Sequence, residues 1–449
     1  IALLICYDDT YWQYARLAAL RGAQIIAWHS VSDRVMPGTP PAQATGNHST
    51  VANVQYMSAQ NGLWVIGATR SGVETNPITG GKLYYNGGSS IWSPAGRKLA
   101  QAPVVPPQEL PPGLREFVSA TIVPADAAAS RAASLARRRP ALYTPLLALH
   151  RNPVDGNATR TARTVALAAV QWPDGPSLLD SVRPAEGELM VLPQLSALPS
   201  GLTAEQIKAR AEPREGAFER ALADAAQAGK GYLVGSYPER AGDAVFHTVV
   251  LAGPAGTVLG RYRVTHPSAQ VAAWATPGDR LSVTETPLGR IGLASSDELA
   301  VPEVAGLYTV LRTDILAAPA GGPSALKVEI DPKLFAVPDP PTGRADYFPY
   351  AAAKQSQLWL VSGGRRVGSG TAAAIYGPEP VVETPTLTAG ADDKALRYKT
   401  VVPAPGTWIN QQQLIANEQP LYFVPLVLDE ASSCMVRWRS RSLEPFPCR

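Results

Sequence analysis

The chain contains very little cysteine: only Cys6, Cys434 and Cys448 occur among its 449 residues. So few cysteines exclude a disulfide framework and favour a reducing, cytoplasmic compartment. Cys434 and Cys448 lie close together in the sequence and could form a bond, but two free thiols in the tail are the favoured interpretation. Cys6 stands apart from both and needs an explanation of its own.

A large net charge and a long apolar run are also missing. The formal net charge of +3 is too small to indicate nucleic acid or a membrane surface as a partner. No apolar run reaches the roughly 18 residues that a membrane span requires, and the start does not resemble a secretory signal. Neither a Cys/His metal-ligand spacing nor a glycine-rich phosphate-binding motif occurs, so we expect no metal and no cofactor.

What is present is the composition of a soluble globular protein, with 45% hydrophobic and 17% charged residues. The chain opens with IALLICYDDTYWQ, and its short continuous apolar run is typical of a strand buried on both faces. Because this run starts without a methionine, we expect a fragment whose upstream residues are missing.

Cys6 follows this predicted strand directly. Thr10 and Gln13 match a capping box that would begin a helix, and Gly22 would end it. A thiol at a strand end, facing a helix N-terminus, is a position in which the helix dipole favours the thiolate. The pattern therefore indicates a nucleophile, although a small buried cysteine at a strand end is also common.

The opening pattern occurs a second time. When Ile1 is set against Ile291 without a gap, Leu3 meets Leu293 and Ile25 meets Ile315. Further similar pairs follow downstream: NGLWVIGATR and SQLWLVSGGR, SSIWSPAG and AAIYGPEP, RRPALYTPLLAL and NEQPLYFVPLVL. Repeats of this kind indicate two copies of one folding unit. We call residues 1–150 the first unit and 163–449 the second unit, with a linker at 151–162.

Several of these segments resemble motifs of the nitrilase superfamily, the carbon–nitrogen hydrolases. ICYD and the helix after it resemble the nucleophile segment, and GSSIWSPAG resembles a later strand and turn. In the second unit, VLPQLSALPSG resembles the stretch that carries the glutamate of the family, and GTVLGRYRVTHP the stretch that carries its lysine. The similar segments span nearly the whole chain and keep their order.

The resemblance implies an α/β fold, an α-β-β-α sandwich. The first unit would then be the C-terminal half of such a domain, and the second unit a complete one. It also implies a Glu–Lys–Cys site, in which a cysteine attacks an amide or nitrile carbon. By the resemblance, Cys6 is the nucleophile and the backbone N–H of Tyr7 faces the oxyanion. The matching glutamate and lysine of the first unit would lie upstream of Ile1.

The second unit departs from the family at all three catalytic positions. Ser296 stands where Cys6 stands, Gln194 takes the place of the glutamate, and Val264 that of the lysine. A carboxamide cannot act as a base, and a serine without a base is a poor nucleophile. His266 is the one histidine nearby in sequence that could rescue a serine hydrolase. We expect the second unit to be catalytically inactive.

Three residues near Cys6 have weaker functional interpretations. Asp8 is favoured as a carboxylate that stabilises the helix N-terminus, with a role in the pocket as the alternative. Trp28 and His29 end the next predicted strand, near the substrate pocket that the resemblance implies. His29 could orient a substrate, or its hydrogen bonds could simply be satisfied within the protein.

The expected function of the parent protein is hydrolysis of a small amide or nitrile through a thioester on Cys6. Acyl transfer to an amine would use the same cysteine, and a non-catalytic ligand-binding or scaffold protein is the alternative from another class. The helices after the two cysteine-type strands would face each other, making the chain an intramolecular pseudo-dimer, or a homo-oligomer would form. We expect the fragment alone to be inactive.

Overall fold

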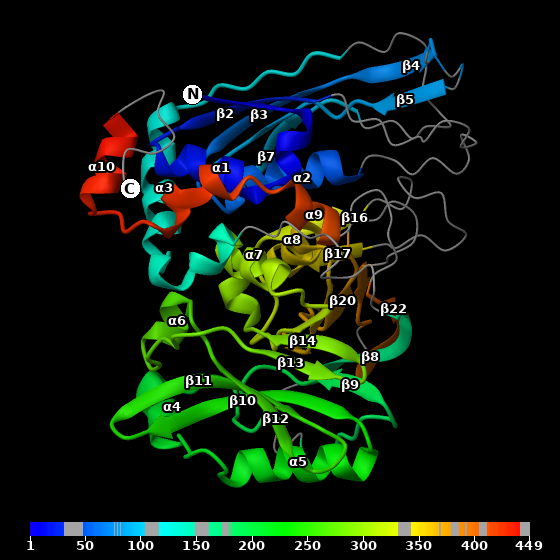
Figure 1. The fold of residues 1–449 in the computed structure, drawn as a ribbon. Helices are drawn as coiled ribbons and strands as arrows, with labels where there is room; N and C mark the ends of the chain where they lie inside the picture. Colours follow the sequence, from blue (N-terminus) through cyan, green and yellow to red (C-terminus); the bar gives the residue numbers. More distant parts are fainter. Residues whose placement is uncertain are drawn as a thin grey trace.

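The structure is a computed structural model. It describes residues 1–30, 48–75, 77–78, 80, 82–103, 116–148, 161–172, 179, 181–330, 343–367, 370–378, 386–390, 393–403 and 411–440. Within these ranges the chain forms three large β-sheets with helices packed between and outside them (Figure 1). The α/β fold expected from the sequence is confirmed. Most of the expected linker, 151–160, lies outside the described residues.

The first unit contributes one sheet with the strand order β1-β2-β3-β6-β7. Strands β1 to β3 run parallel, and β6 and β7 are antiparallel to their neighbours. A separate hairpin is formed by β4 and β5. The strands are β1 (Ala2–Ile5), β2 (Ile25–Ser30), β3 (Trp64–Thr69), β4 (Ser71–Thr75), β5 (Lys82–Asn86), β6 (Ser90–Trp92) and β7 (Lys98–Gln101).

The second unit contributes two sheets that pack face to face. One has the order β12-β11-β10-β9-β8-β19, with β22 also paired to β8, and the other has the order β13-β14-β15-β18-β20-β21. The first comprises β8 (Arg163–Trp172), β9 (Glu188–Val191), β10 (Tyr232–Ala241), β11 (Ala244–Ala252), β12 (Val258–Arg263), β19 (Gly364–Arg365) and β22 (Ala395–Val402). The other comprises β13 (Val283–Thr286), β14 (Gly289–Leu293), β15 (Ile315–Ala317), β18 (Trp359–Ser362), β20 (Ala374–Tyr376) and β21 (Thr386–Thr388).

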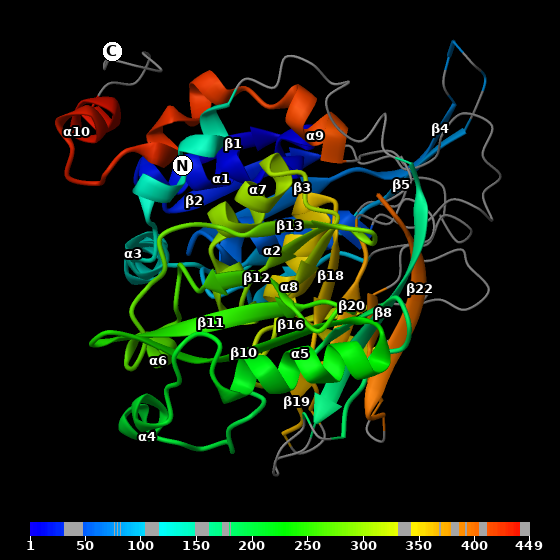
Figure 2. The same cartoon turned by 60° about the horizontal axis from the view of Figure 1, so that its bottom comes forward.

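Helices cover the outer faces of this sandwich, as Figure 2 shows for α5 (Ala217–Gly229) over the β8–β12 sheet. On the opposite side, α7 (Pro302–Val310) and α8 (Tyr347–Ser356) pack on the β14–β20 sheet. In the first unit, α1 (Trp12–Leu20) and α2 (His48–Ala59) cover one face of its single sheet. The second unit is therefore a complete α-β-β-α sandwich, and the first unit has the layers of half of one.

The remaining elements are short or belong to connections and tails. They are η1 (Cys6–Thr10), η4 (Pro124–Asp126), α3 (Ala127–Ala136), η5 (Pro140–Leu142), η6 (Thr144–Leu147), α4 (Ala204–Ala209), α6 (Ala269–Ala272), η10 (Ser296–Ala300), β16 (Lys327–Ile330), β17 (Gly343–Asp346), α9 (Gln411–Asn417), η12 (Pro420–Val427) and α10 (Ser433–Ser440). No helix among the described residues is both long and apolar enough to cross a membrane.

The internal repeat holds at the level of strand register. Leu3 of β1 pairs with Ala27 of β2, and Leu293 of β14 pairs with Ala317 of β15, so both partners are shifted by the same number of residues. Ile25 pairs with Trp64, and Ile315 pairs with Trp359. The ungapped alignment of the two openings thus places equivalent side chains at equivalent points of the two sheets.

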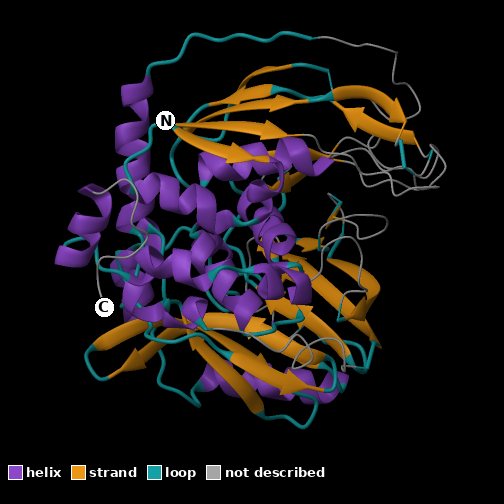
Figure 3. Ribbon diagram, turned by 45° about the horizontal axis from the view of Figure 1, so that its top comes forward, coloured by secondary structure: helices purple, strands orange, loops and turns teal. Residues whose placement is uncertain are grey.

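The helices after the two equivalent strands do face each other, as the pseudo-dimer hypothesis requires (Figure 1). Figure 3 shows helices lying between the sheets of the two units. The Trp12 ring of α1 lies against Gly306 of α7, so closely that a Cβ at Gly306 would be 2.5 Å from it. The side-chain amides of Gln60 and Gln355 exchange hydrogen bonds of 3.1 and 3.2 Å. These two glutamines immediately precede the matching NGLWVIGATR and SQLWLVSGGR segments, so one sequence position contacts its own copy, as in a two-fold dimer.

The tails of the two units are exchanged across this contact. η6 of the first unit packs against α7 of the second, and η12 of the second unit packs against α1 of the first. Tyr143 and Phe423 each lie three residues after the proline that begins the turn in their tail, Pro140 and Pro420, and both are fully buried. Each unit therefore supplies part of the other's apolar core.

Two local predictions are wrong. Helix α1 begins at Trp12, and Thr10 does not cap it, because the chain first makes the 3₁₀ turn η1 that separates β1 from α1. The thiol of Cys434 is not free, because this residue takes part in a disulfide bond. Cys448 lies outside the described residues.

Candidate active site

Cys6 occupies a strained turn at the end of β1. Its backbone φ is +42°, in the left-handed region that costs roughly 1–2 kcal/mol for a residue with a Cβ. The side chain is half-buried and the thiol is free of disulfide bonds. Ser296 at the matching position of the second unit is not among the residues with positive φ. Strain of this kind is concentrated at functional turns, and here it falls on the predicted nucleophile.

Asp8 and Trp28 hold this turn in place. The backbone N–H of Ile5 donates to Oδ2 of Asp8 over 2.8 Å, so the carboxylate caps the turn that contains Cys6. The Nε1–H of Trp28 donates to the backbone carbonyl of Cys6 over 3.1 Å, and the indole is completely buried. Both side chains therefore stabilise the backbone of the turn that contains Cys6.

His29 and Tyr7 are more exposed to solvent. His29 is exposed and stands beside Ile5 in the parallel register of β1 and β2, so it lies on the uncovered face of the sheet near Cys6. The Tyr7 side chain is 42% exposed, and its ring contacts Tyr11 edge-to-face with the centroids 5.8 Å apart. Burial raises the pKa of the Tyr7 phenol.

The sheet that carries Cys6 has one apolar face open to solvent. Ile1 is 84% and Leu3 72% exposed, whereas the matching Ile291 and Leu293 are both 0% exposed. The difference arises because the β8–β12 sheet covers the second pair and packs with it into one core. Equivalent side chains on equivalent strands thus have opposite environments.

In the second unit, two of the three degenerate positions meet at one cavity. Gln194 and Ser296 both line a cavity of about 860 Å³. Their backbone N–H groups donate to the carbonyls of Ala320 and Pro319 over 3.0 and 3.1 Å, which fixes both loops at the end of β15. Val264 is not among the described residues that line it; its side chain is 2% exposed and packs in the core between the two sheets.

His266 is not directed at Ser296. Its Nε2 lies 2.8 Å from the hydroxyl of Tyr143, and its Nδ1 lies 2.8 Å from Oγ1 of Thr265. Burial lowers the pKa of the imidazole to about 3, so the ring is neutral at physiological pH. Since both ring nitrogens already have partners, His266 is not available to Ser296 as a base.

Sequence reasoning missed two charged residues at this cavity. Arg137 reaches it from the tail of the first unit, and its Nη2 donates to the backbone carbonyl of Asp297 over 3.0 Å. Burial lowers the pKa of this guanidinium. The Asp297 side chain also lines the cavity and accepts a hydrogen bond of 3.2 Å from Ser268, while burial raises its pKa. The Arg-rich run at 137–139 was the available signal, but nothing in the sequence indicated that it contacts the other unit.

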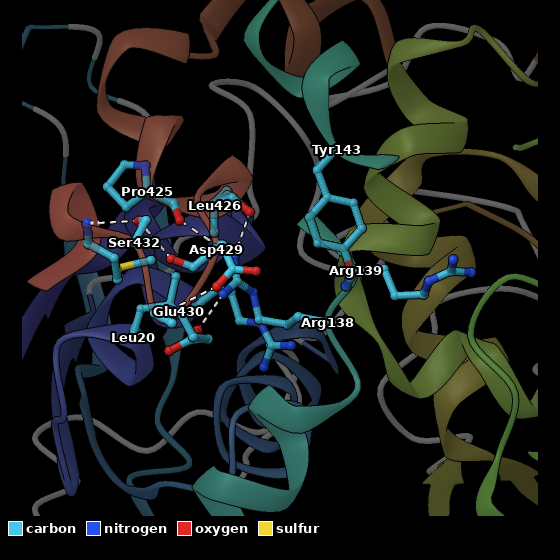
Figure 4. Close-up of polar contacts among 12 residues, drawn as sticks. Leu20, Arg138, Arg139, Tyr143, Pro425, Leu426, Asp429, Glu430 and Ser432 are labelled. Atoms are coloured by element: carbon cyan, nitrogen blue, oxygen red, sulfur yellow. Dashed lines mark hydrogen bonds and ion pairs between the residues drawn. The ribbon is translucent and has the colours of Figure 1, made fainter. Parts of the chain in front are cut away.

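A buried charge cluster joins the two units beside these sites. Glu303 of α7 accepts from Arg16 of α1 over 2.8 Å and from Arg138 over 3.2 Å, and all three side chains are almost completely buried. Burial acts to raise the pKa of Glu303, but the two guanidinium groups outweigh it and hold the pKa below its usual value. Figure 4 shows Arg138 directed toward the second tail, where it also binds Glu430 and the Leu426 carbonyl.

The matching position in the first unit carries a different pair. Gln13 corresponds to Glu303, and its Nε2 donates to Oε1 of Glu418, from the tail of the second unit, over 2.9 Å. Burial raises the pKa of Glu418 to about 7, against smaller opposing effects of Gln13 and Arg312. The two tail contacts are therefore related by the repeat, but one is an ion pair and the other joins a neutral amide to a carboxyl group. Among the described residues no group of three His, Cys, Asp or Glu side chains is placed to hold a metal ion.

A comparison with known sequences identifies the family that these segments match. The profile of the carbon-nitrogen hydrolase family matches residues 1–108 and 161–329, together more than half of the chain. Human omega-amidase NIT2 is 28% identical over 142 residues, which are 29% of this chain. The chain spans about half (51%) of the length of that curated relative.

Solved structures with a similar arrangement are more distant. Nit3 of Saccharomyces cerevisiae, a member of branch 10 of the nitrilase superfamily, is 16% identical, with a TM-score of 0.40; the match covers 53% of this chain and 90% of that one. An amidase of Nesterenkonia is 15% identical, with a TM-score of 0.39, covering 57% and 94%.

Proposed function

Because the chain belongs to the carbon–nitrogen hydrolase family, we propose that Cys6, once a second sheet completes the first unit, is the nucleophile that hydrolyses a non-peptide C–N bond of a small amide or nitrile. The observation that carries this proposal is the position of Cys6 at φ +42° at the end of β1. A cysteine at a strained strand end, free of disulfide bonds and only half-buried, can present its sulfur to a substrate.

The chemistry needs two further groups. The Cys6 sulfur attacks the amide carbon while a carboxylate takes the thiol proton and delivers it to the leaving nitrogen. The C–N bond breaks, ammonia or an amine leaves, and a thioester remains. Water then attacks the thioester, which releases the carboxylic acid and restores the thiol. An ammonium group and the Tyr7 backbone N–H would stabilise the oxyanion in both steps.

We infer that a second sheet supplies these two groups. The uncovered positions of Ile1 and Leu3 match core positions that the β8–β12 sheet covers in the second unit. A covering sheet of the same kind, with a glutamate and a lysine at the places of Gln194 and Val264, would complete the first unit. Because the proposed reaction requires the base that this sheet would carry, we expect no hydrolysis without it.

The second unit serves as the built-in partner of the first in this proposal. It offers α7, the Glu303 carboxylate and the tail at 411–428 to α1, the helix that follows Cys6. Gln194, Val264 and Ser296 give it no base, no oxyanion cation and no activated nucleophile. Cytoplasmic location and acyl transfer to an amine remain compatible with this assignment and do not affect the role of Cys6.

A chimera tests the proposal. A copy of residues 161–290 that carries Gln194→Glu and Val264→Lys is placed before Ile1, which continues the repeat in register. We expect ammonia release from small amides by this protein and none by the 449-residue chain. Exchange protection at Leu3 reports whether the added sheet covers the face, so a folding failure is recognised separately.

Two matched variants locate the chemistry within the chimera. Cys6→Ala is expected to lower the rate at least about 10³-fold, and Ser296→Ala is expected to leave it unchanged. Ammonia release that survives Cys6→Ala in a protein with a covered face would refute the assignment of the nucleophile.

A further inference from the structure

One extended segment of the first unit has no partner for its backbone. Residues 116–123, EFVSATIV, lead into α3 along the outer edge of the first unit (Figure 1). Among the described residues, the N–H and C=O groups of 116–122 form no hydrogen bond. Phe117 is 91% and Val123 is 54% exposed. An extended segment with unpaired backbone groups and exposed apolar side chains can pair readily with another strand.

The second unit contains a copy of this segment, and there it is a paired strand. Both segments lie between the same two matching motifs of the repeat, and TIVPA at 121–125 matches TVVPA at 400–404, so Val123 corresponds to Val402. The copy is β22, whose eight residues all pair antiparallel with β8. A segment that is unpaired in one unit therefore matches a strand that is fully paired in the other.

The side chains of the two copies differ in the same way as their backbones. Leu396 and Val402 of β22 pack into the core between the two sheets, and Val402 is 0% exposed. Phe117 and Val123 stand at the matching positions and are exposed. The apolar residues of 116–123 are therefore those that a covering sheet would bury.

A matching tryptophan ties each copy to the neighbouring sheet. The Trp359 ring of β18 contacts the Tyr398 ring of β22, with the centroids 5.6 Å apart. Trp64 of β3 stands at the matching position, and its Nε1–H donates to the carbonyl of Val123 over 3.0 Å. The segment 116–123 is thus attached to its own sheet at the same point as β22.

We propose that residues 116–123 are the docking strand for the covering sheet and pair antiparallel with its edge strand. That edge strand must have the alternating apolar residues of β8, which directs Val165, Leu167 and Ala169 into the core. Pairing of this kind supplies main-chain hydrogen bonds and lets alternate side chains set the specificity. The proposal rests on the covering sheet of the proposed function and names the place where that sheet attaches.

The repeat also indicates which backbone groups would form the hydrogen bonds. The N–H of Gln171 donates to the carbonyl of Lys394 over 3.0 Å, directly before β22. Because the backbone groups of alternate residues face the same neighbour, the even-numbered residues of 396–402 direct theirs at β8. The matching residues of the first unit are the odd-numbered ones, such as Ser119, whereas Ala120 directs its N–H away from the added strand.

Hydrogen exchange measures whether the strand forms. In the 449-residue chain we expect the amides of 117–122 to exchange as in an unstructured peptide, while those of 396–402 are protected. In the chimera with the added 161–290 segment, exchange at Ser119 and Thr121 should slow by at least about 100-fold. Protection of 117–122 in the 449-residue chain would overturn the proposal, and so would their free exchange in a chimera whose Leu3 is protected.

Two neighbouring proline substitutions in the chimera test the side on which the hydrogen bonds form. Ser119→Pro removes an N–H that would face the added strand, and Ala120→Pro removes one that points away. We expect exchange at Leu3 to be at least about 10-fold faster in Ser119→Pro than in Ala120→Pro. Equal rates in the two variants would contradict the pairing.

A peptide keeps the test valid if the chimera does not fold. The capped peptide of residues 163–172, added to the 449-residue chain, should slow exchange at Ser119 and Thr121, and a scrambled peptide should not. No slowing by either the chimera or the peptide would overturn the proposal. A chimera that protects 116–123 but releases no ammonia would refute the role of Cys6 and leave the pairing intact, whereas ammonia release with 116–123 unprotected would refute only the pairing.

Discussion

The two copies of one strand–turn–helix segment differ in the residue at the predicted nucleophile position and in whether a second sheet covers them. The first copy has Cys6 and a strained turn, but its sheet carries exposed Leu3 on an uncovered face. The second copy has Ser296 and a complete sandwich, in which the matching Leu293 is fully buried. The comparison teaches that the fold of this segment does not depend on the residue at the predicted nucleophile position, because both copies keep the same register around β1 and β14.

The strongest expected effect concerns the charge cluster that joins the units. Glu303→Gln leaves Arg16 and Arg138 buried beside a neutral amide, and we expect a loss of about 3–5 kcal/mol in the free energy of unfolding. Urea denaturation measures it. The control is Glu74→Gln, which breaks an exposed pair with Arg70 and should cost far less, because solvent screens that pair. Equal losses for the two variants would show that the cluster does not hold the units together.

The next effect compares the same strand position in the two sheets. Leu293→Ala opens a cavity in the core between the sheets and should cost about 2–5 kcal/mol. Leu3→Ala removes a side chain that is 72% exposed, and should cost less than about 0.5 kcal/mol in the 449-residue chain. Differential scanning calorimetry of both variants measures this difference in stability. A large loss for Leu3→Ala would mean that something already covers the first sheet in solution.

The pH dependence of stability is a smaller effect, and it distinguishes the two tail contacts. Burial raises the pKa of Glu418 from 4.5 to about 7, so the folded state binds a proton more tightly than the unfolded state. Stability from this group is present below pH 4.5 and is lost as the pH rises to about 7, by at most on the order of 3 kcal/mol. Glu418→Gln should flatten this part of the profile, while Glu186→Gln on the surface should not. A profile that is unchanged by Glu418→Gln would contradict the raised pKa.

Glu303 should show the opposite sign, because its pKa lies below the usual value. Its contribution is present above the pKa of an unfolded glutamate and is lost as the pH falls through the lowered value. The two tail contacts therefore respond to pH in opposite directions. Measuring the free energy of unfolding against pH for Glu303→Gln and for Glu418→Gln separates the two contributions.

The smallest expected effect is at the second copy of the nucleophile position. Ser296→Ala removes a half-buried hydroxyl that has no partner among the described residues, so the free energy of unfolding should change by less than about 0.5 kcal/mol. Ser296→Cys should likewise produce no hydrolysis, since Gln194 cannot accept the thiol proton. Ammonia release by Ser296→Cys would show that the second unit lost only its nucleophile.

Much of the fold could be predicted from the sequence because the repeat presents the same element in two copies with different sequences. The alignment of Ile1 with Ile291 predicted the equivalent strands, and the apolar patterns predicted their burial in the complete unit. The turn after β1 was predicted wrongly, since a Thr-x-x-Gln spacing does not reveal that the 3₁₀ turn η1 comes first. Local patterns describe local capping only when no tertiary contact, such as that of Trp28 with Cys6, decides the turn.

The candidate sites were predictable only in part for a different reason. Cys6, Gln194 and Ser296 lie within recognisable motifs, whereas Arg137 and Glu418 act across contacts of more than 100 residues in sequence. No periodicity or spacing encodes such contacts, because they arise from packing between the two units. The cavity itself became visible only once the loops at 194–202 and 268–274 were placed against each other.

The most direct test of the account is the rate of ammonia release by the chimera that carries the added 161–290 segment, with and without Cys6→Ala. We predict release that depends on Cys6 and persists in Ser296→Ala. Release that continues after Cys6→Ala, in a protein whose Leu3 is protected from exchange, would contradict the proposal that Cys6 is the nucleophile.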